Sequence, residues 1–221
     1  MQFQMLGRSV RGNWLSGHCS ARTDRGGTLI FAGFHGDEPK SVYVARELLK
    51  MLEDDALRGL PPWMIVPLVN PDGFKRKRRC NAHSVDINRN FPTKDWAPGA
   101  VRSRMFGGTA PAGEPETRAV MRAVARFRPA RIITIHSISG SRQCNNYDGP
   151  GKRLAAMMAR LNGYPVTDNI GYPTPGSFGT WAGIERKIPT ITLELPARHS
   201  PRKCWDDNRE ALLRAIRLKS D

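Results

Sequence analysis

The sequence predicts an α/β protein, a three-layer sandwich in which helices flank both faces of a mixed, largely parallel, twisted sheet. Apolar runs rich in β-branched residues alternate along the chain with segments of helical periodicity, as expected when crossover helices join parallel strands. The chain has 221 residues, of which 39% are hydrophobic and 25% charged, within the range of one globular domain. Because no internal repeat or linker is visible, we expect residues 1–221 to form a single domain.

Four segments are expected to be buried strands, because apolar and β-branched residues dominate them and turn residues bound them. These segments are 28–34, 64–69, 131–135 and 189–195. Four other segments have apolar residues at helical spacing and are expected to be amphipathic helices. The predicted helices are 39–52, 113–127, 152–161 and 206–218. The sequence "NPDG" after the second strand is interpreted as a turn.

The distribution of apolar residues and cysteines indicates a cytoplasmic protein with no membrane association. No apolar run approaches the roughly 20 residues of a membrane span, and the N-terminal segment lacks the apolar core of a signal peptide. The cysteines are widely spaced, without a C-x-x-C motif, which favours free thiols in a reducing compartment. They are Cys19, Cys80, Cys144 and Cys204.

Polar residues stand where the predicted strands end. His35 follows the first strand, Asn70 the second and His136 the third, while the fourth carries Glu194. Ligands of open α/β sheets bind outside the carboxyl ends of strands, so these side chains are expected to meet at one rim. A single histidine there is more often a strand cap that backbone groups satisfy. Two histidines together with Glu194 and Glu38 favour a functional site.

The stretch "HGDE" suggests a metal site. A catalytic zinc ion needs three protein ligands and one open position, and His35, Glu38 and His136 would supply them. Gly36 would let the chain turn sharply, and Glu38 would lie in the first turn of a helix, where the dipole favours an anion. Glu194 is a candidate base for the attacking water; the alternative is a carboxylate that only pairs with an arginine.

The order of motifs resembles a known family. H-x-x-E after a strand, N-P-D-G, R-x-N-A-x-x-V-D-x-N-R-N-F-P, a strand-end histidine and T-x-E-x-P follow one another between residues 28 and 196. This combination resembles the zinc carboxypeptidase family of carboxypeptidase A. Within that family, "GYPTPGSFGTW" and "GEPET" resemble the bacterial murein peptide amidase branch, whose members cut the bond between γ-D-glutamate and meso-diaminopimelate.

The resemblance implies catalytic roles for individual residues. It implies one Zn²⁺ ion held by the two histidines and Glu38 named above, with Glu194 as the general base. Asp86 would orient a ligand histidine from behind, which fixes its tautomer. Arg79 would stabilise the oxyanion, because a fixed cation lowers the energy of a developing negative charge.

The resemblance also implies substrate-binding residues. Asn88 and Arg89 would hold the terminal carboxylate of the substrate, which a guanidinium binds with two hydrogen bonds. Tyr172 lies in the region of the family's mobile tyrosine. The segment "SISGSRQCNNYDG" after His136 is expected to line the pocket. Within it, Asp148 and Arg142 are interpreted as ordinary loop residues, with contact to the zwitterionic end of diaminopimelate as the alternative.

We therefore expect a zinc-dependent peptidase or amidase that cleaves an amide next to a free carboxylate, with a murein tripeptide as substrate and a role in peptidoglycan recycling. The alternatives are another metallocarboxypeptidase, a deacylase of N-acyl amino acids, or a metal-free binding protein with the same fold. The oligomeric state is left open.

The net charge of +15 raises the question of nucleic acid. The run "KRKRR" at 75–79 is basic, but it leads directly into the predicted pocket and has no aromatic stacking platform. We interpret its first four residues as a solvated loop, or as a guide for a small acidic peptide substrate. Nucleic acid is not an expected partner.

Overall fold

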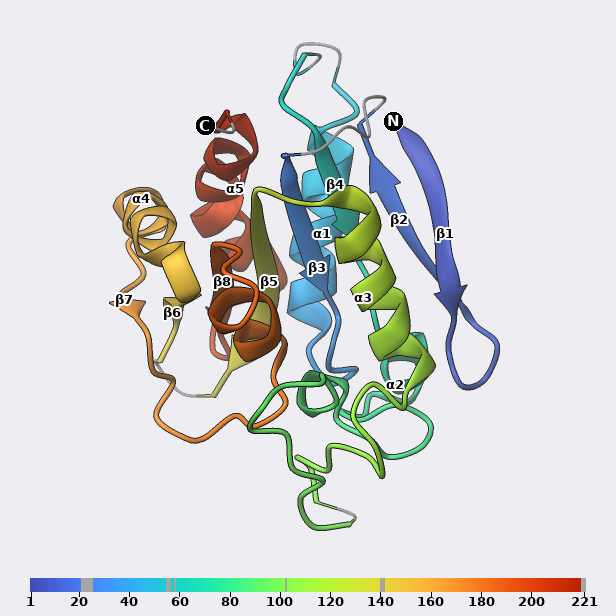
Figure 1. Ribbon diagram of the computed structural model, residues 1–221. Coiled ribbons are helices and arrows are strands. Elements are labelled where there is room, and N and C mark those ends of the chain that lie inside the picture. Colours follow the sequence, from blue (N-terminus) through green and yellow to red (C-terminus); the bar gives the residue numbers. More distant parts are fainter. Residues whose placement is uncertain (21–25, 55–56, 58, 102, 140–141, 220–221) are drawn as a thin grey trace.

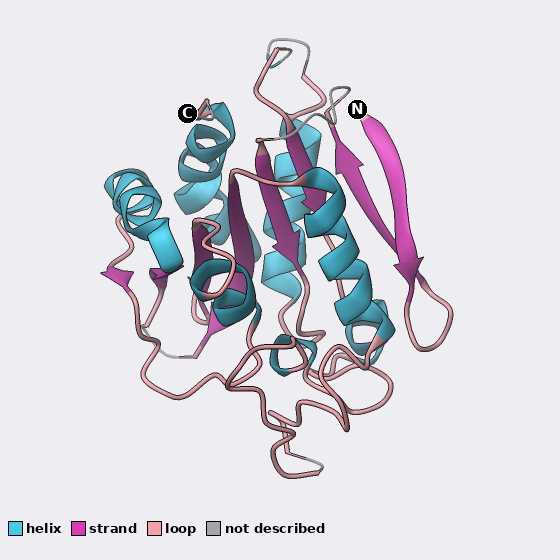
Figure 2. Cartoon of the chain, viewed as in Figure 1, coloured by secondary structure: helices cyan, strands magenta, loops and turns pink. Residues whose placement is uncertain are grey.

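The computed structural model describes residues 1–219 apart from 21–25, 55–56, 58, 102 and 140–141. Within these residues, eight strands form one sheet in the order β1-β2-β4-β3-β5-β8-β6-β7 (Figures 1 and 2). The strands are β1 Gln2–Arg8, β2 Trp14–Cys19, β3 Thr28–Ala32, β4 Trp63–Val66, β5 Arg131–Ile138, β6 Cys144–Asp148, β7 Val166–Thr167 and β8 Thr190–Pro196.

Helices cover both faces of the sheet. The α-helices are α1 Pro39–Met51, α2 Pro71–Arg76, α3 Pro115–Phe127, α4 Lys152–Asn162 and α5 Pro201–Arg217. Short helical turns are η2 Ile87–Arg89, η3 Gly149–Gly151 and η4 Thr180–Ile184. One apolar cluster joins α1, α4 and α5 to the sheet, and a second joins α3 and η4 to its other face. Figure 1 shows α3 in front of the sheet and α1 behind it.

The sheet is mixed and mostly parallel at its centre, which confirms the predicted fold class. β4, β3, β5 and β8 are neighbours in this order and run parallel. The hairpin of β1 and β2 joins β4 antiparallel, and β6 joins β8 antiparallel on the other side. The four central strands therefore all end at the lower rim in Figure 1, where long loops gather.

The predicted strands and helices are observed, with ends shifted by up to three residues except in α5. That helix begins at Pro201 instead of 206, because the Ser200 side chain accepts a hydrogen bond from the Lys203 backbone N–H at 3.1 Å and caps it. The sequence did not predict β1, β2, β6 or β7. β1 is largely exposed, β2 buries only alternate residues, and β6, "CNNYD", is polar, so none of these three has the apolar run of a buried strand.

The interpretation of "NPDG" as a turn was wrong, since it begins α2. Asn70 is the N-cap, and its Oδ1 accepts a hydrogen bond from the Gly73 N–H at 2.8 Å. Pro71 occupies the first turn, where its missing N–H has no partner to lose. An asparagine followed by proline is as typical of a helix start as of a turn.

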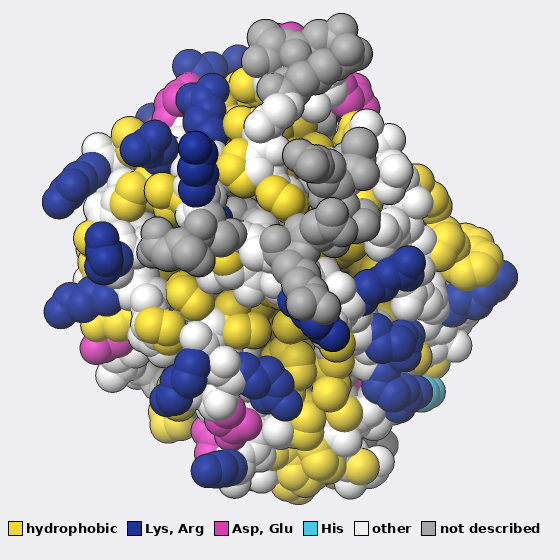
Figure 3. All heavy atoms as spheres, turned by 45° about the horizontal axis from the view of Figure 1, so that its top comes forward, with side chains coloured by type: hydrophobic (Ala, Val, Ile, Leu, Met, Phe, Trp, Pro, Cys, Tyr) yellow, Lys and Arg dark blue, Asp and Glu magenta, His cyan; other side chains and the backbone are white. Residues whose placement is uncertain are grey.

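The face of the molecule seen in Figure 3 carries many basic side chains but no dense cationic block. Lys and Arg side chains are scattered among apolar and neutral groups on the face formed by the top of Figure 1 (Figure 3). Residues 75–78 are exposed at the end of α2, as expected for the solvated part of the basic run. Among the described helices, none combines the length and the apolar character that crossing a membrane requires.

Two leucines on helices test how the core holds the layers together. Leu48 on α1 is 0% exposed and belongs to the cluster against the sheet, whereas Leu161 on α4 is 47% exposed. Leu48→Ala should lower the free energy of unfolding by about 2–5 kcal/mol, because it leaves a cavity in the core. Leu161→Ala should cost less than about 1 kcal/mol. Urea denaturation compares the two, and equal losses would contradict the packing described here.

Candidate active site

His35 and Glu38 are placed by the loop between β3 and α1. The strand ends at Ala32, so His35 lies three residues beyond it. Glu38 is the N-cap of α1, one position before the first turn where it was expected, and its side chain makes no capping bond. Its Oε1 atom instead lies 2.6 Å from Nδ1 of His35. The carboxylate is thus directed at the histidine and away from the helix backbone.

Gly36 allows the loop to pass close to α2. A Cβ atom at this position would lie 2.0 Å from the carbonyl carbon of Gly73. The Gly36 N–H also donates to the carbonyl of Arg79 at 3.2 Å. The glycine is therefore required by a close backbone approach and not only by the sharp turn that the sequence suggested.

His136 comes from β5 and completes the group. The strand continues to Ile138, so His136 lies within it and not at its end as predicted. Its Nδ1 atom is 3.3 Å from Nδ1 of His35 and 3.2 Å from Oε2 of Glu38. The ring stacks on Phe34 with centroids 5.5 Å apart and an interplanar angle of 19°. Apolar packing therefore fixes the orientation of this ligand.

The three side chains fit a metal ion. One possible ligand atom from each of His35, Glu38 and His136 lies within 4.8 Å of the others, and all three residues are buried. Two imidazole nitrogens that face each other cannot both use their lone pairs in a hydrogen bond between them. A cation among these atoms satisfies all three, and two imidazoles with one carboxylate are a donor set typical of catalytic zinc.

Asp86 lies behind His35. Its Oδ1 atom is 3.1 Å from Nε2 of His35, and its Oδ2 atom accepts from Nε of Arg79 at 2.9 Å. Although burial favours the neutral acid, the charges of His35 and Arg79 hold the pKa of Asp86 well below its usual range. Burial lowers the pKa of His35, but the carboxylates of Glu38 and Asp86 outweigh it and raise that pKa to about 9. Asp86 thus links the metal group to Arg79.

Glu194 lies on β8, beside the metal group. In the parallel ladder it is the partner of His136, it is 6% exposed, and its Oε2 atom has no hydrogen-bond partner among the described residues. Burial, followed by the nearby charge of Glu38, raises the pKa of Glu194 to about 8. A carboxyl group with a pKa near neutrality can both accept and return a proton during one reaction.

The metal group and Glu194 line one pocket, and two arginines line it as well. Arg79 makes ion pairs with Asp86 at 2.9 Å and Glu38 at 3.8 Å, and its side chain is 17% exposed. Arg89 is 2% exposed, and its Nε atom has no partner among the described residues. Burial lowers the pKa of Arg89, against the carboxylate of Asp86 and the Tyr172 hydroxyl, which raise it. Arg89 therefore has hydrogen-bonding capacity left for a ligand.

Asn88 is oriented by the backbone, since its Oδ1 atom accepts from the N–H of Phe178 at 2.9 Å. All nine residues that the sequence proposed for the site are brought together here. Eight of them line one pocket, and Asp86 lies behind it. The eight are His35, Glu38, Arg79, Asn88, Arg89, His136, Tyr172 and Glu194.

The pocket extends beyond the residues that the sequence identified. Thr192 and Ser177 line it, although neither was predicted, and Asn146 lines it as expected for the segment after His136. Asp148, interpreted as a loop residue, instead ends β6 and lines the same pocket, whereas Arg142 is exposed and does not. The period of two in "CNNYD" could have shown that alternate residues face one side of a strand.

Fold and site together define a metallohydrolase, and the comparisons with known proteins name its family. The zinc carboxypeptidase family, peptidase M14, matches residues 1–203. The chain belongs to this family, as its motifs predicted. It has the buried His-Glu-His group typical of the single zinc site of these enzymes, and it is therefore a zinc-dependent metallopeptidase.

Individual relatives are more specific. Murein peptide amidase A of Escherichia coli K12 is 33% identical over 201 residues, which cover 86% of this chain and 79% of that protein. The protein of the same name from Vibrio campbellii is 32% identical over 180 residues, 76% of this chain and 68% of the relative.

Solved structures agree with this result. The crystal structure of murein-tripeptide amidase from E. coli O157 superimposes with a TM-score of 0.82 at 29% identity, covering 100% of this chain and 94% of that one. Carboxypeptidase A from Helicoverpa armigera has a TM-score of 0.77 at 21% identity, over 97% of this chain and 68% of the other, and shows the same fold.

The metal group can be tested directly. His136→Ala should purify with much less zinc than the wild-type protein, because one of three ligands is lost. His18→Ala, a substitution on β2 outside the pocket, is the matched control and should keep the wild-type zinc content. Inductively coupled plasma mass spectrometry of the purified proteins measures this. Equal zinc in the His136→Ala and wild-type proteins would exclude His136 as a ligand.

Proposed function

We propose that this metallopeptidase hydrolyses the γ-D-glutamyl–meso-diaminopimelate bond of a murein tripeptide. Cleavage next to a free carboxylate is supported by one observation. The guanidinium of Arg89 is buried, and its Nε atom has no hydrogen-bond partner among the described residues. It lines the same pocket as the metal group and Glu194. The murein peptide amidases among the relatives support the identity of the substrate.

In this proposal, the terminal carboxylate of the substrate binds Arg89 and the side-chain amide of Asn88. A bidentate bond to a guanidinium fixes both the position and the orientation of a carboxylate. Tyr172, which is 39% exposed at the pocket, would close over the bound substrate from the solvent side. This anchoring places the scissile amide between the metal group and Glu194.

His35, Glu38 and His136 would hold the zinc ion, which would polarise the scissile carbonyl and make a water molecule more acidic. Glu194 accepts a proton from the attacking water and returns it to the leaving amine. Its raised pKa suits both transfers. Arg79, fixed by Asp86 on one side, donates toward the oxygen that becomes negative in the transition state.

The setting of the reaction is part of the proposal. We place it in the cytoplasm, within peptidoglycan recycling, and we treat residues 1–221 as one catalytic domain. All four cysteines are free, which suits a reducing compartment. The substrate would be a small acidic peptide, attracted by the basic surface, and neither a nucleic acid nor a membrane is a proposed partner.

The role of Glu194 is tested by Glu194→Gln. This change keeps the shape of the side chain but removes the proton acceptor, so kcat should fall by about 100- to 10,000-fold. The zinc content and thermal unfolding midpoint should match the wild-type values, which separates lost chemistry from lost structure. A variant that retains more than roughly a tenth of wild-type kcat would show that another group is the base.

The substrate is tested by comparing kcat/KM values. The enzyme should release diaminopimelate from L-Ala-γ-D-Glu-meso-diaminopimelate and largely ignore hippuryl-Phe and N-acetyl amino acids, because a polar pocket rejects an apolar analogue. Amidation of the terminal carboxylate of the tripeptide should abolish its advantage. A preference for hippuryl-Phe would indicate another carboxypeptidase, and a preference for N-acetyl amino acids would indicate a deacylase.

A further inference from the structure

The segment "GEPET", residues 113–117, has no role in the proposed chemistry. It forms the start of α3, with Glu114 as the N-cap and Glu116 in the first turn. Neither side chain lines the pocket of the metal group. Both are nevertheless buried, with Glu114 7% and Glu116 0% exposed. Because a buried carboxylate is costly unless hydrogen bonds compensate it, the partners of these two acids indicate what the segment does.

The two carboxylates share one partner, the side-chain amide of Asn81. Its Nδ2 atom donates to Oε2 of Glu114 at 2.7 Å and to Oε2 of Glu116 at 3.1 Å. Both donor positions of the amide are therefore used. Asn81 is 6% exposed, so it cannot turn away without leaving two buried acids short of a donor. We call these three residues the Asn81 clamp.

The other end of the same amide closes the loop between Arg79 and Asp86. Oδ1 of Asn81 accepts from the N–H of His83 at 3.0 Å and from the N–H of Val85 at 3.1 Å. The backbone N–H of Asn81 donates to the carbonyl of Val85 at 2.9 Å. Arg79 and Asp86 flank the loop, and their side chains form an ion pair at 2.9 Å. Asn81 thus closes a turn whose two ends carry these charged residues.

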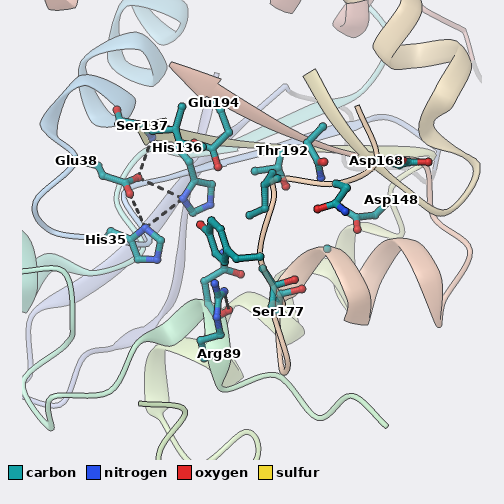
Figure 4. A pocket seen from close by; sticks show the side chains of 18 of the residues that line it. His35, Glu38, Arg89, His136, Ser137, Asp148, Asp168, Ser177, Thr192 and Glu194 are labelled. Carbon is teal, nitrogen blue, oxygen red and sulfur yellow. Dashed lines mark hydrogen bonds and ion pairs between the residues drawn. The ribbon is translucent and has the colours of Figure 1, made fainter. Parts of the chain in front are cut away.

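The start of α3 also holds the segment of Arg89, which lies at the lower wall of the pocket in Figure 4. The next residue, Asn90, accepts at Oδ1 from the N–H of Glu114 at 3.1 Å. Nδ2 of Asn90 donates to the carbonyls of Gly107 at 2.7 Å and Ala110 at 2.9 Å. Helix α3 is itself packed in the apolar cluster on this face of the sheet. A packed helix therefore anchors the two loops that carry arginines.

We infer that Asn81, held by Glu114 and Glu116, is a positioning residue for Arg79 and Asp86. It lines no part of the pocket, so it acts only through the turn that it closes. A guanidinium lowers the energy of a transition state when it is already in place before charge develops. The inference rests on the proposed function in one respect, that Arg79 acts on the oxygen that becomes negative.

Asn81→Asp should slow the reaction in a way that depends on Arg79. It keeps the size and the Oδ1 acceptor of the side chain but replaces the donor with a third carboxylate. On the murein tripeptide, kcat should fall about 10- to 100-fold, as for other groups that orient an active-site residue from behind. Arg79→Ala should itself lower kcat about 100- to 1,000-fold. Asn81→Asp added to Arg79→Ala should cost less than about threefold more, because both changes act through one group.

A triple variant restores the clamp with its donors reversed. In Asn81→Asp/Glu114→Gln/Glu116→Gln, two glutamine amides donate to the new aspartate, so kcat should return to within about threefold of the wild-type value. Asn208→Asp is the matched control. Asn208 on α5 is 0% exposed, lies outside the pocket, and donates to the Tyr164 hydroxyl at 3.2 Å. Its change should lower the unfolding midpoint but keep kcat.

Cys80 reports on the turn without any need for activity. It lies between Arg79 and Asn81 and is partly exposed, whereas the other three cysteines are buried. Burial raises the pKa of the Cys80 thiol to about 11, so its reaction with the thiol reagent DTNB should be slow in the wild-type protein. Asn81→Asp should speed this reaction about tenfold or more by opening the turn, and the triple variant should reverse the gain. Mass spectrometry of peptides identifies the modified cysteine.

The outcomes separate the clamp from the proposed function. Multiplying losses of kcat in the Arg79→Ala/Asn81→Asp variant, or a triple variant as slow as Asn81→Asp, would overturn the positioning role. A wild-type kcat in Arg79→Ala would overturn the proposed role of that arginine, and no cleavage of the tripeptide would overturn the proposed substrate. In either case the Cys80 reaction decides on the clamp: a faster reaction in Asn81→Asp that the triple variant reverses supports it, and an unchanged reaction overturns it.

Discussion

One buried carboxylate connects the parts of this active site. Asp86 is 0% exposed and accepts hydrogen bonds from His35, from Arg79 and from the backbone N–H of Asn88 at 2.9 Å. A metal ligand, the proposed oxyanion group and the start of the turn that carries Arg89 thus share one anion. Breaking up such a network leaves buried charge uncompensated, so these residues hold one another in place.

The parallel sheet fixes the position of His136 relative to Glu194. The register of β5 against β8 makes His136 the partner of Glu194, and backbone hydrogen bonds on both strands maintain this spacing. A ligand for the metal and the carboxyl group that we propose as the proton acceptor therefore come from the most deeply buried part of the sheet. The loop residues His35 and Glu38 complete a site whose distances the core has already set.

How much the sequence could predict depended on the kind of signal. The four central strands and the helices α1, α3, α4 and α5 were predicted, because apolar runs and helical periodicity report burial directly. His35, Glu38, His136 and Glu194 followed from their places near strand ends. The hairpin of β1 and β2 was missed because β1 is mostly exposed and β2 buries only alternate residues. The segment that contains β6 was expected to line the pocket, but β6 was not predicted as a strand, because it is polar and a polar strand is identified only by its neighbour in the sheet.

The position of β6 also bears on how enzymes of this kind diversify. Beyond it the sheet continues only with β7, which pairs with β6 through two residues, so this strand lies close to the edge. The central strands, packed between helices on both faces, tolerate little change. Substitutions on β6 can therefore reshape this wall of the pocket, while His136 on β5 and Glu194 on β8 keep their positions.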